Sequence, residues 1–396
     1  MLLSWHVSLC FIASIFPFFS VAANAGQALL PKPNGRFQVS LGITELIDES
    51  RLQPFAPTIQ PRRLMISLFH PVNSREQTSP IEYMPPETAA FEDDSESSQY
   101  GLESPNGTFE KLALQLACQS PQAHEQSHFP VVLFSPAEGT TRLFYSVIAQ
   151  TIASSGYIVV TIDAPYDVDI VEYPDGLEAL LNTTIAANPT IADIDLAVSV
   201  RAQDASFVLD ELSKASVINQ LIPGSSHGLN VRKVGMFGHS LGGAATATAM
   251  LNDSRIAGGL NMDGAFWGSV VQQGLDRPFM FMAHTNHTRT DDEAADDPAN
   301  SWYDIWPNLR AWKLDIIIAN SLHYTFSDFP IVLETLGIVP NATTAANLLV
   351  TDLDGSRALQ IVTTYVTAFL DFVLKSKNSP LLQGPVTEFP EVTFER

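Results

Sequence analysis

Hydrophobic and polar residues follow two alternating patterns along most of the chain. From Phe129 onward, short runs of consecutive apolar residues are separated by segments in which apolar residues recur every three or four positions. The short runs are typical of strands buried on both faces of a sheet, and the second spacing is typical of helices with one buried face. Because the two kinds of segment alternate, the pattern predicts an α/β fold with a mostly parallel central sheet, right-handed crossovers and helices on both faces.

The predicted elements can be placed by residue number. The predicted strands are 130–135, 157–163, 231–238, 256–262, 278–284 and 313–320. The predicted helices are 142–156, 191–216, 241–251 and 357–376. Two earlier apolar runs, 36–41 and 63–70, predict an N-terminal antiparallel strand extension. Since no repeat of fixed period is visible, we expect residues 26–396 to form a single domain.

Two segments show neither pattern. Residues 72–128 are rich in Pro, Ser, Glu and Gln and contain the acidic run FEDDSESS at 91–98, and residues 285–300 are also acidic. Polar segments without periodicity are usually solvent-exposed loops. We therefore predict loop insertions near 72–128 and 285–300.

The first 25 residues have the pattern of a secretory signal peptide. An apolar stretch from Val7 to about Ala22 precedes small residues, and cleavage after Ala25 would leave a mature chain that begins at Gly26. The alternative is an uncleaved membrane anchor, but the apolar run is short, is broken by Pro17 and lacks a following charge cluster. We expect a secreted, extracellular protein.

Sequons and cysteines bear on the same prediction. Five Asn-X-Ser/Thr sequons would be available for glycosylation in the secretory pathway: Asn106, Asn182, Asn252, Asn286 and Asn341. Of the two cysteines, Cys10 would leave with the signal peptide, so Cys118 would be the one cysteine of the mature chain. The predicted stability therefore comes from the core rather than from disulfides.

The charge of the chain narrows the classes of partner. The sequence holds 21 Lys and Arg residues against 43 Asp and Glu residues, a formal net charge of −22. Such a field repels nucleic acids and anionic membrane surfaces, and no cluster of basic residues offsets it. We expect no nucleic-acid partner and no obligate protein partner, while a transient contact with a lipid surface stays open.

One pattern in the chain predicts a nucleophilic serine. The G-x-S-x-G motif holds a serine on a sharp turn between a strand and a helix, where its hydroxyl is exposed beside backbone N–H groups. The motif occurs twice, around Ser226 and around Ser240. Around Ser226 a strand follows the motif instead of preceding it. Around Ser240 a predicted strand, the motif and an alanine-rich helix occur in the required order, so Ser240 is the predicted nucleophile.

The base and the acid should follow the serine in the order acid, then histidine. His284, His287 and His323 are the histidines beyond Ser240, and His323 lies just past a predicted strand, where a base on a loop at the carboxyl edge of the sheet belongs. We therefore expect His323 to be the base.

Two positions compete for the acid. Asp263 ends a predicted strand, whereas Asp291 and Asp292 lie in an acidic run after the next strand, where hydrolases of this type most often place the acid. A lone aspartate at a strand end suits the buried carboxylate of a triad better than an acidic run does. A metal site formed by His284, His287 and Asp291 is the less favoured interpretation of the same segment, so we expect no metal and no cofactor.

The segment GHSLGGAATATAMLNDSRIAGGLNMDGAFWG resembles the G-H-S-x-G-G region of the secreted platelet-activating factor acetylhydrolases, an α/β-hydrolase family whose acid follows the next strand. Ser321-Leu-His323 before Phe326-Ser-Asp-Phe is similar to the segment that carries the family's histidine. FPVVLFSPAEGTTRLFYSVIAQTIASSGYIVVTIDAP is similar to the family's oxyanion-loop segment. The resemblance implies an α/β-hydrolase fold, with Ser240, Asp263 and His323 as the catalytic triad.

The chain departs from the family in the oxyanion loop. The family has His-Gly after the strand serine, whereas this chain has Pro136 and Ala137 after Ser135. By register, the backbone N–H of Glu138 would pair with that of Leu241 to bind the oxyanion. A glutamate there, in place of an apolar residue, puts a negative side chain near the mouth of the site.

These observations lead to one preferred function and two alternatives. The preferred function is a secreted serine esterase that hydrolyses short acyl esters, and the resemblance implies the sn-2 acetyl group of phospholipids similar to platelet-activating factor. A cutinase-like or general carboxylesterase, or a polyester hydrolase, is the second interpretation. The third is a non-catalytic hydrolase-fold binding protein, which is disfavoured because such proteins typically lack a member of the triad.

Overall fold

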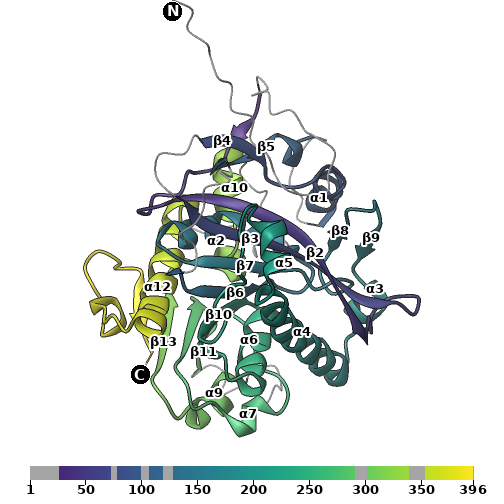
Figure 1. Ribbon diagram of the computed structural model, residues 1–396. Coiled ribbons are helices and arrows are strands. Elements are labelled where there is room, and N and C mark those ends of the chain that lie inside the picture. The colour runs from purple at the N-terminus through teal and green to yellow at the C-terminus, as the bar shows by residue number, and fades with distance from the viewer. Residues whose placement is uncertain are drawn as a thin grey trace, which may run out of the picture.

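A computed structural model of the chain describes residues 26–72, 78–99, 107–118, 128–289, 301–338 and 353–395 (Figure 1). Several sequence predictions lie outside the described residues: the signal peptide, the sequons at Asn106 and Asn341, most of the second loop insertion (residues 290–300), and the rival acids Asp291 and Asp292 within it.

In the described part of the chain, nine strands form the central sheet, in the order β14-β13-β12-β11-β10-β6-β7-β3-β2. Their bounds, in that order, are Val392–Phe394, Lys313–Ile318, Phe279–His284, Ile256–Met262, Val234–His239, Val131–Ser135, Ile158–Ile162, Pro61–Val72 and Gln38–Leu52. Neighbours from β13 to β7 pair in parallel, whereas β14, β3 and β2 pair antiparallel at the two ends. The mostly parallel sheet and the N-terminal antiparallel extension are as predicted, and β14 is an addition.

Helices cover both faces of this sheet (Figure 1). One face carries α2 (Ser146–Ser154), α10 (Phe329–Leu336) and α12 (Gly355–Lys375). The other face carries α4, α5, α6, α7 and α9, with the bounds Ile191–Leu212, Ala215–Leu221, Leu241–Asn252, Val270–Gln273 and Trp302–Ile305. The helix α12 has the length and apolarity of a membrane span, yet most of its apolar side chains are buried against the sheet and its neighbours.

Strand β6 shows why the uninterrupted apolar runs form the centre of the sheet. Successive side chains of a strand point to opposite faces. Val132 and Phe134 enter the cluster under α2 and α12, whereas Val131 and Leu133 enter the cluster under α4 and α6. All four are buried, so each residue of the run fills one of the two cores.

The segment 72–128 is not one loop insertion, and that prediction is wrong for its described parts. It contains β4 (Thr78–Glu82), α1 (Pro86–Gln99), the 3₁₀ turn η1 (Phe109–Lys111) and β5 (Leu112–Ala117). Within the described ranges, β4 and β5 form a three-stranded sheet with β1 (Ala28–Leu29).

The acidic run of this segment lies in α1 instead of in a solvated loop. Glu92 and Asp93 are buried, and the Asp93 carboxylate accepts the backbone N–H groups of Gly107, Thr108 and Phe109 at 2.6, 3.0 and 3.1 Å. A buried carboxylate that accepts several backbone N–H groups has a structural role. The acidic run in the sequence does not by itself predict this burial.

Short elements complete the described chain. They are η3 (Arg142–Tyr145), β8 (Ile170–Glu172), β9 (Glu178–Leu180), α3 (Thr183–Ala186), η4 (Trp306–Asn308), η5 (His323–Phe326) and η6 (Pro380–Leu382). Cys118 is disulfide-bonded. The expectation of a chain without disulfides concerns the form cleaved after Ala25 and stays a prediction, since residues 1–25 lie outside the described residues.

Candidate active site

Ser240 occupies a sharp turn between β10 and α6. Its backbone has φ 53° and ψ −123°, a conformation that a residue with a side chain adopts only under strain. The Ser240 N–H donates to the carbonyl of Met262 at 2.8 Å, which ties the turn to the end of β11. The geometry is that of the predicted elbow. Ser226, by contrast, is exposed in the segment before β10.

The glycines of the motif let three backbone segments meet around Ser240. A Cβ on Gly238 would lie 2.2 Å from the carbonyl oxygen of Gly242, and one on Gly242 would lie 2.1 Å from that of Ser135. A Cβ on Gly264 would lie 1.9 Å from the carbonyl oxygen of Ser240. The close approach of the elbow to the β6 and β11 ends therefore requires glycine at these positions.

Asp263 directly follows β11 and is buried, with a left-handed backbone at φ 62°. Its N–H donates to the carbonyl of Met282, which places the carboxylate at the end of β12 as well. His323 Nδ1 lies 2.5 Å from Asp263 Oδ2. The structure thus brings together the predicted acid and the predicted base.

Two further histidines contact the same carboxylate. His284 Nδ1 lies 2.8 Å from each oxygen of Asp263, and the His284 backbone N–H donates to Oδ1 at 3.1 Å. His287 Nδ1 lies 2.9 Å from Oδ1. Burial alone would raise the pKa of Asp263, but the hydrogen bonds from His284, His287 and His323 hold that pKa well below its ordinary value. Because an ionised carboxylate only accepts hydrogen bonds, the three rings donate Nδ1–H.

This tautomer suits His323 for the work of a general base. With Nδ1–H held by Asp263, the Nε2 lone pair of the neutral ring is available to take a proton. His323 begins η5, just past β13, and its ring centroid lies 4.6 Å from that of His239, the residue before Ser240. The arrangement can therefore support proton transfer beside the elbow.

His239 connects the elbow to the loop that follows β6. It is buried, and burial followed by the nearby His323 holds its pKa well below the ordinary value, so the ring is neutral. Its Nδ1 lies 2.8 Å from the hydroxyl of Tyr145, which also accepts the N–H of Ala137 at 3.2 Å. The histidine of the motif is thus a structural link, and its partner Tyr145 was not predicted.

Arg201 of α4 holds the same loop through its carbonyl groups, and no motif in the sequence singles this arginine out. Its buried guanidinium donates to the carbonyls of Pro136 and Ala137. It also forms a bidentate salt bridge with Asp167, in which Nε lies 2.6 Å from Oδ2 and Nη2 lies 2.8 Å from Oδ1. Carbonyl and N–H point in opposite directions across a trans peptide. Because the Ala137 carbonyl faces Arg201, the N–H of Glu138 points away from it.

The two predicted oxyanion donors thus have distinct anchors. The N–H of Leu241 belongs to the first turn of α6, where N–H groups have no acceptor inside the helix. The N–H of Glu138 is oriented by the Arg201 clamp. Partial burial and the charge of Asp167 raise the pKa of the Glu138 carboxyl, and Arg201 acts in the opposite direction.

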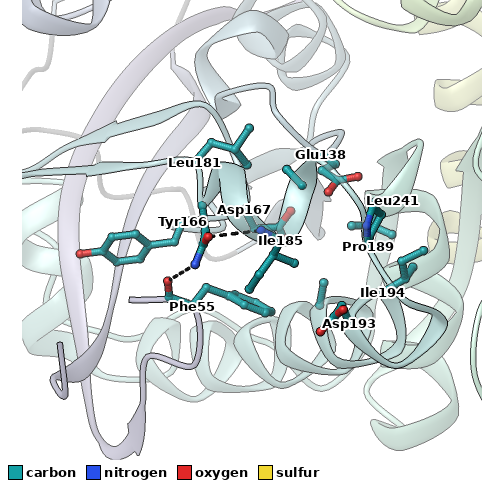
Figure 2. A pocket seen from close by; sticks show the side chains of 13 residues that line it. Phe55, Glu138, Tyr166, Asp167, Leu181, Ile185, Pro189, Asp193, Ile194 and Leu241 are labelled. Atoms are coloured by element: carbon teal, nitrogen blue, oxygen red, sulfur yellow. Dashed lines mark hydrogen bonds between the residues drawn. The ribbon is translucent and has the colours of Figure 1, made fainter. Parts of the chain in front are cut away.

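A pocket adjoins both predicted donors (Figure 2). Its lining residues come from the loops after β2, β6, β7 and β9, from α3 and the loop that follows it, and from the starts of α4 and α6: Phe55, Glu138, Tyr166, Asp167, Leu181, Asn182, Ile185, Ala186, Pro189, Asp193, Ile194, Ala197 and Leu241. Most of these side chains are apolar, and Glu138, Asp167 and Asp193 add carboxylates. The pocket therefore suits a small apolar group beside the oxyanion donors.

The described sequons differ in their surroundings. Asn252 and Asn286 are exposed. Asn182 is half-buried in the pocket wall, where its side chain donates to the Phe55 carbonyl at 3.0 Å and accepts the Ile185 N–H at 3.4 Å. The amide that would carry a glycan at Asn182 is therefore already engaged.

The chain matches known proteins along most of its length. The family model "Platelet-activating factor acetylhydrolase, isoform II" matches residues 22–173 and 212–380. A protein of Arthroderma benhamiae named "Probable 1-alkyl-2-acetylglycerophosphocholine esterase" is 35% identical over 385 residues, 92% of this chain and 93% of that protein. A solved ferulic acid esterase from Streptomyces cinnamoneus matches with a TM-score of 0.75 and 28% identity, covering 94% of this chain and 100% of that chain. The structural match confirms the predicted α/β-hydrolase fold.

Proposed function

Because the chain belongs to the platelet-activating factor acetylhydrolase isoform II family and is a carboxylic ester hydrolase, we propose that it removes the sn-2 acetyl group from 1-alkyl-2-acetylglycerophosphocholine and similar phospholipids. The observation that carries the proposal is the 35% identity, over nearly the whole chain, to a protein named as an esterase for that lipid. The pocket beside Leu241 and Glu138 supports it, because the lining is suited to a short acyl group.

In the proposed mechanism, the hydroxyl of Ser240 attacks the ester carbonyl. Nε2 of His323 takes the serine proton and returns it to the leaving alcohol, and a water then releases the acyl group by the same route. Asp263 fixes the tautomer of His323 and stabilises the imidazolium as it forms. The N–H groups of Leu241 and Glu138 stabilise the oxyanion, a contribution worth about 2.7–4 kcal/mol for each donor.

Glu138 bears on which acyl groups are accepted. Its carboxyl lines the pocket together with that of Asp193, so an acyl chain with a terminal carboxylate would meet charges of its own sign. A neutral acetyl group meets no such repulsion. The glutamate that departs from the family pattern is thus compatible with the proposed substrate.

A second candidate is a broader carboxylesterase, favoured by the 28% identity to a ferulic acid esterase over the whole of that chain. Purified enzyme should be assayed with 1-alkyl-2-acetylglycerophosphocholine, its long-chain sn-2 analogue, methyl ferulate, p-nitrophenyl acetate and polyester film. The proposal expects kcat/KM for the acetyl phospholipid to exceed that of the long-chain analogue by at least about tenfold, the discrimination that a few methylenes give in an apolar pocket. A higher kcat/KM for methyl ferulate than for the acetyl phospholipid would favour the second candidate.

The same preparation identifies the nucleophile. Ser240→Ala should lower kcat by about 10⁶ and remove labelling by a fluorophosphonate probe. Ser226→Ala is the matched control, since it makes the same change in the exposed copy of the motif and should leave both unchanged. Labelling that survives in Ser240→Ala but not in Ser226→Ala would overturn the mechanism.

We also propose that the protein is secreted, after cleavage behind Ala25, and that Asn252 and Asn286 carry glycans. The proposal is supported by the apolar N-terminal stretch and by the exposure of both asparagines. N-terminal sequencing of the protein from culture medium, before and after deglycosylation, tests it. An intact N-terminus on a cell-retained, unglycosylated protein would refute it.

A further inference from the structure

Three histidine rings in the described part of the chain converge on the carboxylate of Asp263. His323, His284 and His287 approach it at 2.5, 2.8 and 2.9 Å, each through Nδ1. Potential ligand atoms of Asp263, His284 and His323 all lie within 4.8 Å of one another. A triad requires one histidine on its acid, so the mechanism above leaves His284 and His287 unexplained.

The composition of this cluster fits a transition metal. Three imidazole nitrogens and one carboxylate oxygen are the ligand types that Zn²⁺ and related ions prefer, and four is the number that Zn²⁺ most often takes. Ligand atoms at about 2.0–2.1 Å from a tetrahedral ion are about 3.3 Å apart. The contacts of the three rings with Asp263 are shorter than that by less than about 1 Å. His287 is not in the group whose ligand atoms all lie within 4.8 Å of one another, so it would have to move further than His284 and His323 to complete a four-ligand site.

Access and charge also suit a cation. The Asp263 carboxylate is fully shielded, while the side chains of His284, His287 and His323 are 21%, 16% and 28% exposed. An ion can therefore approach from the histidine side and meet the buried negative charge behind it.

We propose that Asp263, His284, His287 and His323 bind a divalent transition-metal ion such as Zn²⁺, and that the bound ion reversibly inhibits the esterase. The proposal rests on the proposed triad. It assigns to His284 and His287 a role as metal ligands.

The chemistry of inhibition follows from the tautomer of His323. In the active form Nδ1 carries the proton and Nε2 carries the lone pair that accepts the serine proton. When the ion binds Nδ1, the ring remains neutral only if its proton moves to Nε2. A His323 with a proton on Nε2 cannot take another from Ser240, and its Nδ1 no longer donates to Asp263. The bound ion therefore removes the base without altering the serine.

Initial rates with p-nitrophenyl acetate in buffers of defined free Zn²⁺ test the proposal. Activity should fall as free Zn²⁺ rises and should return when EDTA is added. Ca²⁺ and Mg²⁺ at equal concentration should have no effect, because these ions prefer oxygen ligands. The double variant His284→Gln/His287→Gln keeps Asp263 and His323, so its half-inhibiting Zn²⁺ concentration should rise at least about tenfold, with each rate normalised to the metal-free rate of the same variant.

His227→Gln is the matched control, because it removes an exposed histidine far along the chain from the cluster and should leave the half-inhibiting concentration unchanged. Co²⁺ absorption gives a readout that does not need activity: visible bands of a tetrahedral site should appear in wild type and disappear on addition of Zn²⁺. Equal Zn²⁺ sensitivity of the double variant and wild type, or no Zn²⁺ effect on an active enzyme, would overturn the metal site alone. Failure of the proposed function would instead appear as no turnover of any ester in metal-free buffer.

Discussion

Replacement of Asp263 by Asn tests whether this aspartate is the acid of the triad. The same replacement at another buried aspartate should leave kcat almost unchanged. The substitution keeps the size of the side chain but exchanges one acceptor oxygen for an NH₂ donor. In the structure Oδ1 accepts from the His284 backbone N–H and the His287 ring, while Oδ2 accepts from His323. An asparagine oxygen that keeps the two contacts at Oδ1 turns its NH₂ group towards Nδ1 of His323.

The size of the effect follows from that geometry. Facing an NH₂ group, His323 must present its Nδ1 lone pair, which moves the ring proton to Nε2 and removes the acceptor for the serine proton. The negative charge that stabilises the imidazolium is lost at the same time. In a Ser-His-Asp triad this change lowers kcat by about 10⁴ with the geometry intact, equivalent to about 5.4 kcal/mol of transition-state stabilisation.

The assay is kcat and KM for p-nitrophenyl acetate and for the acetyl phospholipid, with thermal unfolding measured on the same preparations. Asp315→Asn is the matched control. Asp315 lies on β13 and is also fully buried, but burial and its contact with Glu395 raise its pKa to about 8, so it is protonated at neutral pH. Asparagine imitates a protonated aspartate, and Asp315→Asn should keep kcat within about threefold of wild type.

A kcat of Asp263→Asn within tenfold of wild type would refute the assignment. If the double variant Asp291→Asn/Asp292→Asn then lost activity, the acid would lie after β12. Acidic residues that do not contact the histidine act only through charge screened by solvent, which is worth about 1 kcal/mol or less, so the double variant should otherwise lose less than tenfold.

Two further predictions concern the oxyanion loop and the dependence of stability on pH. Arg201→Lys keeps a positive charge beside Asp167 but replaces the planar guanidinium by a single ammonium group, which cannot hold Asp167 and both loop carbonyls in the same geometry. We expect kcat to fall about 10²-fold with little change in KM. Arg255→Lys, in a more exposed ion pair, is the control, and an unchanged kcat in a well-folded Arg201→Lys would contradict the role of Arg201 in orienting the loop. The pKa of Asp315 and that of Asp328 are both raised to about 8, mainly by burial, so the folded protein retains protons that the unfolded chain releases above about pH 4. Buried His70 and His239 have lowered pKa values and act in the opposite direction below about pH 6.5. The free energy of unfolding should therefore decrease most clearly as the pH rises from about 6.5 to 8, by up to about 1.4 kcal/mol per pH unit for each aspartate. Unfolding midpoints at about pH 6.5 and about pH 8 check this: Asp315→Asn should narrow the difference between them, and a wild type that is more stable at the higher pH would contradict the prediction.

The sequence predicts the parts of the fold that depend on local patterns. The spacing of apolar residues predicts the buried strands and the amphipathic helices. The glycines of the motif predict the elbow, because the close approach of β10, α6 and β6 requires them. Asp263 and His323 could be predicted as acid and base because each follows a strand directly or after its terminal turn, at the edge where parallel strands end. Their contact at 2.5 Å agrees with that expectation.

Contacts between distant segments could not be predicted in this way. Arg201 occupies one polar position among many on an amphipathic helix, and only the folded chain shows it buried with Asp167 and the oxyanion loop. His287 lies in a polar sequence and was expected in a solvated loop, yet its ring packs 4.2 Å from that of Trp302 and its Nδ1 reaches Asp263. The acidic run of α1 likewise contains two buried carboxylates, those of Glu92 and Asp93, that the sequence pattern did not predict. A polar side chain has no local signal for burial when its partner is far along the chain.

The ends of β11 and β12 show why the acid position and the extra histidines belong to one arrangement. Met262 and Met282 are paired in register, so the residues that follow them lie side by side at the edge of the sheet. In the more common hydrolase arrangement the acid follows the later strand. Here Asp263 follows the earlier strand, and His284 ends the later one and donates both its backbone and its ring N–H to Asp263. Two carboxylates at these adjacent positions would repel each other and raise the pKa of one of them. Moving the acid to β11 therefore favours a donor at the end of β12, and that donor is what brings the second imidazole of the proposed metal site to the triad.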